Sequence, residues 1–199
     1  MGKRLNEKDL LDGVLGGDKA AMRGLYDCYV GHLTAVATRY LPEEDDVKDV
    51  LQEGFIKIFT TLGNFSYRGE GSLKAWMTRI VVNEAIDFLG VRKRSEQLYD
   101  RDFETGGGRD EADNYEEPDI GNVPMNVIYE MIRHLPDGYR SVFNLYVFEE
   151  KSHKDIAKML NIKESTSASQ LHRAKAMLAQ QIKEYLTTQN RSGLWKNNG

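Results

Sequence analysis

Cysteine, long apolar runs and catalytic motifs are scarce or missing in this sequence. Among 199 residues there is one cysteine, Cys28, so an internal disulfide is excluded and a reduced, cytosolic compartment is expected. Cys28 itself is expected to be a small core residue on an apolar helix face. No apolar run approaches the roughly 20 residues of a membrane span, and Lys3 and Arg4 are not followed by the apolar stretch of a signal peptide.

Enzyme motifs are also missing from the sequence. There is no Walker loop, no nucleophile–base signature and no metal-ligand cluster. The four histidines, His32, His134, His153 and His172, are scattered along the chain. We therefore expect no cofactor, no metal and no catalytic activity.

Charge is segregated along the chain. The formal net charge is −4, which argues against a simple basic nucleic-acid coat. Residues 1–94 are neutral overall, residues 95–124 carry a net charge of −8 and residues 125–199 a net charge of +4. Such a pattern suits a protein that touches phosphate in selected places.

Apolar residues recur with helical spacing in two separate stretches. The first stretch predicts helices over 6–15, from an Asp18 cap to Pro42, over 44–62 and from a Ser72 cap to about Arg94. The second predicts helices over 125–134, 136–148, from a Ser152 capping box, and from about Lys163 to Leu186, with a frayed tail beyond. Residues 95–124 contain a glycine triplet, two prolines and ten acids, which indicates a flexible linker. The fold class is therefore all-α: two small four-helix domains, 1–94 and 125–187, joined by an acidic linker, with a tail at 188–199.

The stretch from Ser152 to Leu178 has the form of a helix-turn-helix, whose second helix enters the major groove of DNA. In that helix Ser167, Leu171, Ala174 and Leu178 form the buried stripe. Outward-facing residues could read bases or hold a phosphate, while His172 and Lys175 lie where backbone contact is expected. The residues expected to contact DNA are Ser165, Thr166, Ser169, Gln170, His172, Arg173 and Lys175, although a solvated polar helix face would look the same.

The N-terminal half offers a second polar surface. On the helix over 72–94, Arg79 and Asn83 share a face with Asp87, and the helix ends in basic residues. This face could lie along a nucleic-acid strand, or its residues could simply pair within the helix. The preceding loop could clamp an unpaired base, and Trp76 is either a core residue or a stacking surface. The candidate residues are Phe65, Tyr67, Arg68, Trp76, Arg79, Asn83, Arg92 and Lys93.

The helix over 44–62 has an acidic edge beside Ile56 and Phe59. Exposed apolar residues among acids suit a protein partner better than DNA, although a solvated acidic face would look the same.

These segments, in this order, resemble the bacterial sigma factors of the extracytoplasmic-function group in the sigma-70 family. Residues 46–59 resemble the segment that grips the clamp helices of RNA polymerase, residues 72–94 the −10 element reader, and residues 135–178 the −35 element reader. The resemblance implies a bacterial cytoplasmic initiation factor that binds core RNA polymerase and promoter DNA and is held by an anti-sigma factor. It also implies core-polymerase docking by Asp49, Gln52, Glu53, Phe55 and Ile56.

Three rival functions fit parts of the pattern. A repressor acting without polymerase would need a dimer or effector domain, which residues 1–94 do not suggest. An enzyme with an appended DNA-binding domain would need a catalytic motif. A purely protein-binding adaptor would not need a basic helix rich in small side chains.

Overall fold

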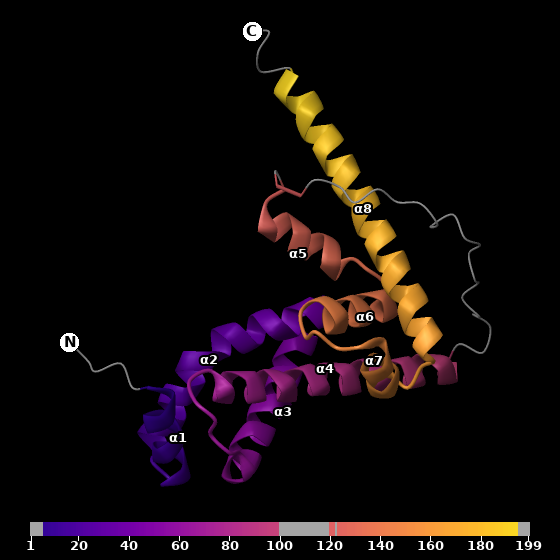
Figure 1. Ribbon diagram of the computed structural model, residues 1–199. Coiled ribbons are helices and arrows are strands. Elements are labelled where there is room, and N and C mark those ends of the chain that lie inside the picture. The colour runs from indigo at the N-terminus through magenta and orange to yellow at the C-terminus, as the bar shows by residue number, and fades with distance from the viewer. Residues whose placement is uncertain (1–5, 100–119, 122, 195–199) are drawn as a thin grey trace. The chain divides into compact units, whose positions relative to one another are not determined.

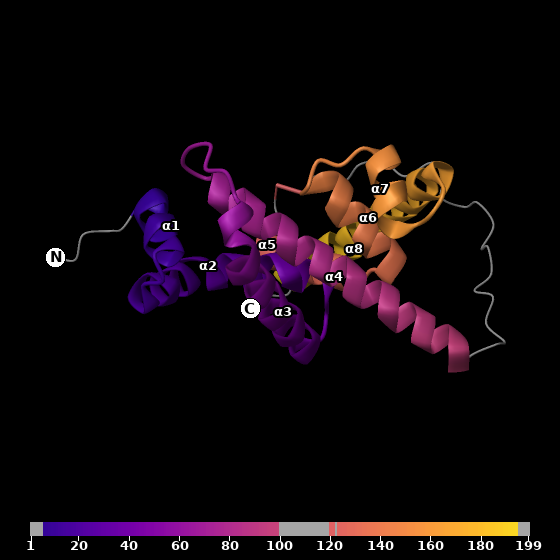
Figure 2. The same ribbon diagram turned by 90° about the horizontal axis from the view of Figure 1, so that it is seen from below.

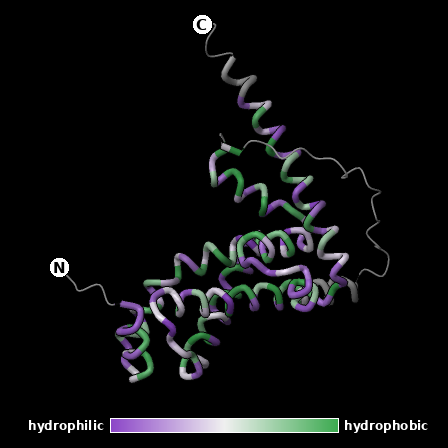
Figure 3. The backbone as a smooth tube through the Cα atoms, in the orientation of Figure 1, coloured by the Kyte–Doolittle hydropathy of each residue, from purple (hydrophilic) through white to green (hydrophobic). Residues whose placement is uncertain are grey.

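The computed structural model describes residues 6–99, 120–121 and 123–194, and the side chains of residues 6–92, 120–121 and 123–189. Within these ranges the chain forms eight α-helices and one 3₁₀ helix and contains no strand (Figure 1). The all-α prediction is therefore confirmed. Hydrophobic and hydrophilic residues alternate along these helices (Figure 3), as the spacing of the apolar residues predicted.

The chain divides into two compact units, at residues 1–91 and 92–199. The helices of the first unit are α1 (Glu7–Leu15), α2 (Lys19–Tyr40), α3 (Glu44–Thr61), η1 (Leu62–Asn64) and α4 (Ser72–Tyr99), of which α4 continues past the boundary. The helices of the second unit are α5 (Met125–Arg133), α6 (Asp137–Val147), α7 (His153–Leu160) and α8 (Glu164–Leu194).

Helix α2 is the centre of the first unit, because α1 and α3 both pack against it (Figure 2). Its caps are those the sequence predicted: Asp18 accepts a hydrogen bond from the amide of Ala20, and the helix ends at Tyr40, before Pro42. Its expected apolar stripe is buried, with Leu25, Leu33 and Tyr40 inaccessible to solvent. From α4, Leu73, Met77 and Val81 complete this core.

Two helix ends differ from the prediction. Helix α4 continues to Tyr99 rather than stopping at Arg94, and α8 continues to Leu194 rather than fraying after Leu186. Both extensions lack proline, which would stop a helix. Residues 100–119 of the expected linker lie outside the described residues, so the predicted flexible linker stays a prediction.

The position expected for Cys28 is wrong. Its side chain is exposed on α2, because the buried side of this helix follows Leu25, Tyr29, Leu33 and Val36, and Cys28 lies beside that line. An isolated thiol on a helix surface adds nothing to the core.

The second unit has a core of Ile132, Leu135, Ala174 and Leu178. Helices α5, α6 and α7 all pack on α8, which therefore organises this unit. The capping box at Ser152 is present: its Oγ accepts from the amide of Asp155 at 3.2 Å and donates to the Asp155 carboxylate at 2.6 Å. In no described helix is there a segment with both the length and the apolar character needed to cross a bilayer.

Candidate nucleic-acid interface and protein-docking groove

The helix-turn-helix consists of α7, the turn at residues 161–163 and the start of α8. Asn161 ends α7 in the left-handed conformation, with a φ of 52°, and its amide donates to the carbonyl of Ala157. Asparagine adopts this conformation more readily than other residues with a Cβ. The turn is therefore encoded locally, and it sets the direction in which α8 leaves α7.

The buried stripe of α8 is the one predicted. Ser167, Leu171, Ala174 and Leu178 are all buried. Ser167 is polar and fully buried, and its Oγ shares a hydrogen bond of 3.0 Å with Nδ1 of His153 on α7. This bond satisfies the hydroxyl inside the unit and joins the two helices.

The opposite face of α8 carries the residues expected to contact DNA. Ser165 and Ser169 are exposed, whereas Thr166, Gln170, His172, Arg173 and Lys175 are half-buried. Two of these side chains lean on α6, which the sequence did not indicate. A Cβ at Gly138 would lie 3.2 Å from the amide nitrogen of Gln170, and Nη1 of Arg173 donates to the hydroxyl of Tyr139 at 3.4 Å. These contacts hold Gln170 and Arg173 beside the start of α6.

The loop before α4 brings its aromatic residues onto that helix. Phe65 packs on Trp76 with ring centroids 5.1 Å apart, and both side chains are half-buried. Trp76 is thus neither a fully buried core residue nor an isolated stacking surface. Tyr67 is half-buried and Arg68 exposed. Desolvation and the nearby carboxylates of Glu70 and Glu7 raise the pKa of Tyr67 above its usual value.

The cap of α4 differs from the prediction. Ser72 is the first helical residue rather than the N-cap, and its hydroxyl donates to the carbonyl of Gly69 at 2.6 Å. The helix is capped from α1 instead: the Glu7 carboxylate accepts from the amides of Gly71 at 2.7 Å and Lys74 at 3.0 Å. Spacing in the sequence cannot reveal a cap that comes from another helix.

The polar face of α4 is exposed as predicted, at Arg79, Asn83 and Asp87. Arg92 is also exposed, and the side chain of Lys93 lies outside the described side chains. This face is accessible along its described length, so it could lie against a nucleic-acid strand.

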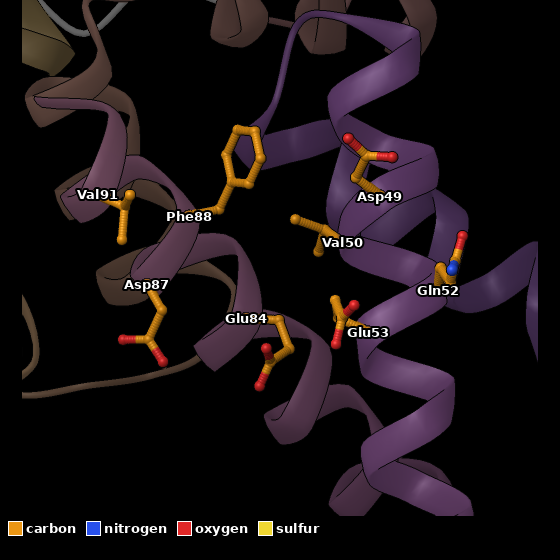
Figure 4. A pocket seen from close by; sticks show the side chains of 8 residues that line it. All are labelled: Asp49, Val50, Gln52, Glu53, Glu84, Asp87, Phe88 and Val91. Atoms are coloured by element: carbon orange, nitrogen blue, oxygen red, sulfur yellow. The ribbon is translucent and has the colours of Figure 1, made fainter. Parts of the chain in front are cut away.

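A groove of about 370 Å³ lies between α3 and α4 (Figure 4). Its rim is acidic, with Asp49 and Glu53 from α3 and Glu84 and Asp87 from α4, and Gln52 lies beside them. Val50, Phe88 and Val91 supply its apolar lining. Lys57 forms an ion pair with Glu84, and this contact raises the pKa of the Lys57 ammonium.

One of the residues expected for docking differs from the rest. Phe55 is buried, with 6% of its surface exposed, and packs between Tyr26 and Phe59. Its ring belongs to the interface of α2 and α3, which leaves little of it exposed, and its assignment to polymerase docking stays a prediction. Ile56 is 50% exposed, as expected of a contact residue.

The sequence pattern does not identify the α4 side of the groove. It places Asp87 on the polar face of α4 and gives no partner for Phe88 and Val91. One indication of a protein-binding surface is visible in the sequence, because α4 has an acid and two apolar residues within five positions. Periodicity does not show which helix lies beside them. In the described part of the chain, no group of three His, Cys, Asp or Glu side chains could hold a metal ion.

Two family models match the chain. The model "Sigma-70 region 2" matches residues 25–95, and "Sigma-70, region 4" matches residues 125–178. The chain is 29% identical over 188 residues to the ECF RNA polymerase sigma-E factor of Haemophilus influenzae, covering 92% of this chain and 98% of the relative. The sigma-E factor of Escherichia coli K12 is also 29% identical, with 92% and 97% covered.

A solved structure resembles the chain as well. It is the sigma factor RpoE of Bartonella quintana in complex with the anti-sigma factor NepR, at 20% identity. The match covers 81% of this chain and 96% of that one, with a TM-score of 0.49.

Proposed function

Since the chain belongs to the sigma-70 family, in its extracytoplasmic-function group, and so binds core RNA polymerase and directs promoter recognition, we propose which of its surfaces carries each step. The chain is an initiation factor and not an enzyme, and the polymerase supplies the catalysis.

The groove between α3 and α4 is proposed to dock core polymerase. Asp49, Glu53 and Asp87 give it a negative rim, and Phe88 gives it an apolar wall (Figure 4). A basic, amphipathic segment of the polymerase would match both features, because charge complementarity speeds encounter and apolar burial slows dissociation. Gln52 belongs to the same surface, and Ile56 adds an exposed apolar residue on α3.

The loop over 65–70 and the exposed face of α4 are proposed to hold the opened −10 strand. Phe65, Tyr67 and Trp76 offer aromatic surface, on which an unstacked base gains about 1–3 kcal/mol. Arg68, Arg79, Asn83, Arg92 and Lys93 offer hydrogen-bond donors to the strand. Opening costs a few kcal/mol per unstacked step, which captured bases can offset.

The outer face of α8 is proposed to read the −35 element in the major groove. Gln170 can pair with adenine and Arg173 with guanine, and Ser165, Thr166 and Ser169 allow close approach or hold phosphate. His172 and Lys175 lie farther along the helix, where the DNA backbone is expected.

One observation carries this assignment most directly: α4 presents an exposed polar face and, next to it, one wall of an acidic groove. A single rigid helix would therefore connect polymerase docking to strand capture. We further propose that the protein acts in the bacterial cytoplasm, where core polymerase acts, and that an anti-sigma factor holds it between uses, as is common in this group.

The test is run-off transcription with purified core polymerase. We expect the groove variant D49R/E53R to lower transcript and polymerase affinity by about tenfold or more, corresponding to about 1.4 kcal/mol. The matched control is Asp12→Arg, which reverses an exposed acid on α1 outside the groove. Equal losses in the groove variant and the control would contradict groove docking. Gel shifts with and without core polymerase separate this function from that of a repressor, which would bind specifically by itself.

A further inference from the structure

Glu7 is a buried acid whose carboxylate holds the start of α4. It is 3% exposed, although charged residues are rarely buried without partners. Oε2 accepts from the amide of Gly71 at 2.7 Å, and Oε1 accepts from the amide of Lys74 at 3.0 Å and from the Tyr29 hydroxyl at 3.1 Å. Three elements therefore meet at one side chain: α1, α2 and the start of α4.

The chemistry of the site explains why a remote carboxylate is used. The residue before α4 is Gly71, which has no side chain with which to cap the helix, and its φ of +86° is one that residues with a Cβ rarely adopt. The first amides of a helix have no partners within it and carry partial positive charge. A carboxylate on these amides satisfies both requirements through charge-assisted bonds.

The Tyr29 bond fixes the carboxylate from the other side. Burial and then the Glu7 carboxylate raise the pKa of the Tyr29 phenol well above its usual range, so the phenol remains a hydrogen-bond donor at neutral pH. Glu7 thus has both oxygens engaged, and movement of α1 would disturb them.

The same contact fixes one end of the loop over 65–70. Gly71 is the residue that follows Glu70, so its amide is the point where the loop joins the helix. Inside the loop, the Ser72 hydroxyl donates to Gly69 and accepts from the amide of Arg68. A bond at Gly71 and a bonded turn over 68–72 leave this end of the loop little freedom.

We propose that Glu7 is a positioning residue for −10 recognition, which makes α1 a working part of the −10 reader. The proposal rests on the proposed function of the loop over 65–70. It also goes beyond the region 2 match, which begins at residue 25 and omits α1 entirely. Glu7 acts through the loop rather than by touching DNA, because its carboxylate is buried and already bonded.

The test compares initiation on promoters that differ at single −10 bases. In Glu7→Gln the amide nitrogen cannot accept a hydrogen bond, so one of the two backbone amides loses its partner. We expect the preference between the best and second-best base at the captured −10 position to fall by about fivefold, as the loss of one hydrogen bond to a carboxylate would allow. Discrimination at the −35 element and affinity for core polymerase should stay within about twofold of wild type.

Two controls separate positioning from general destabilisation. Asp9→Asn removes the same charge from the exposed first turn of α1 and should leave −10 discrimination unchanged. Glu7→Asp keeps the charge but is one methylene shorter, so it should give an intermediate preference even if Glu7→Gln folds poorly. Amide hydrogen exchange at one or both of Gly71 and Lys74 should be faster in each Glu7 variant.

The outcomes are distinct. A uniform fall in transcript from all promoters, with base preference unchanged, would overturn the positioning role. Unchanged exchange at Gly71 and Lys74 would overturn the cap itself. If wild-type protein showed no preference at the −10 element, the function proposed for the loop would fail as well, whatever the Glu7 variants did.

Discussion

The Nδ1 atom of His153 lies 3.0 Å from the Oγ atom of Ser167, which joins the two helices of the helix-turn-helix by a hydrogen bond. Tyr146 stacks on the His153 ring with centroids 4.9 Å apart, so the imidazole is fixed from a second direction. Ser167 lies between Thr166 and Ala168, in the first turns of the helix that is proposed to face DNA. The bond therefore fixes how α8 rotates relative to α7.

Replacing Ser167 with alanine should destabilise the second unit by about 1–2 kcal/mol, because the imidazole loses its partner and the buried hydroxyl is removed. Denaturant unfolding of the full chain, followed by a probe in that unit, measures the change. Ser165→Ala is the matched control, since Ser165 is exposed two positions earlier on the same helix. Its replacement by alanine brings the same gain in helix propensity as the replacement of Ser167. Equal stabilities for the two variants would show that the bond contributes nothing.

Gly13→Ala should be strongly destabilising. A Cβ at Gly13 would lie 2.6 Å from the Cβ of Ala21, so α1 would have to move away from α2. Such overpacking costs about 1–3 kcal/mol. In contrast, Gly31 lies on the exposed side of α2 with open space around it. Gly31→Ala should therefore be neutral or stabilise the protein by about 0.5–1 kcal/mol. Thermal unfolding distinguishes the two, and a loss in both variants would contradict the argument from close contact.

Stability of the first unit should fall below about pH 6.5 because of His32. Desolvation, followed by the charges of Lys74 and Arg39, lowers the pKa of the His32 imidazole, and the ring shares a hydrogen bond of 3.0 Å with the Thr78 hydroxyl. The unfolded chain then binds a proton more readily than the folded chain, so stability is lost as the pH falls through the unfolded pKa of 6.5.

The measurement is urea unfolding of wild type and His32→Gln at about pH 7.5 and about pH 5.5. Wild type should lose more stability between these values than the variant, in which this titration is absent. His134→Gln, at an exposed histidine of the other unit, serves as the control. Identical losses in wild type and His32→Gln would refute the assignment.

Arg173 and Lys175 should have different effects on −35 recognition by the holoenzyme. Arg173→Ala should cost about 1–3 kcal/mol on the preferred sequence and relax the preference at one base pair, because its guanidinium is proposed to read a base. Lys175→Ala should weaken binding to all sequences evenly. It should also reduce the slope of log affinity against log salt concentration by about one. Titrations at two or more salt concentrations on matched and mismatched promoters separate these cases. A uniform loss for Arg173→Ala would place it on the DNA backbone.

The periodicity of the sequence predicted the helices and most of the core. The stripe through Leu25, Leu33 and Tyr40 is buried as expected, because helical spacing alone determines which residues share a face. The ends of α4 and α8 were missed, since the linker and tail were located by composition rather than by a residue that stops a helix.

Contacts between helices were less accessible to sequence reasoning. Phe55 was expected to meet a partner, yet Tyr26 and Phe59 cover it. Nothing in the sequence marks Glu7, because its partners Gly71 and Lys74 lie more than 60 positions away in the chain. In both cases the deciding fact is which helix packs next to the residue, and spacing along one helix contains no such information.

The exposed position of Cys28 has a practical consequence. Its thiol is the sole cysteine of the sequence and lies on the surface of α2, apart from the residues that line the groove. A maleimide dye would therefore attach to every molecule at one known place, and no other side chain would first have to be changed. Fluorescence from that dye could time the arrival of the factor at polymerase and its departure after initiation.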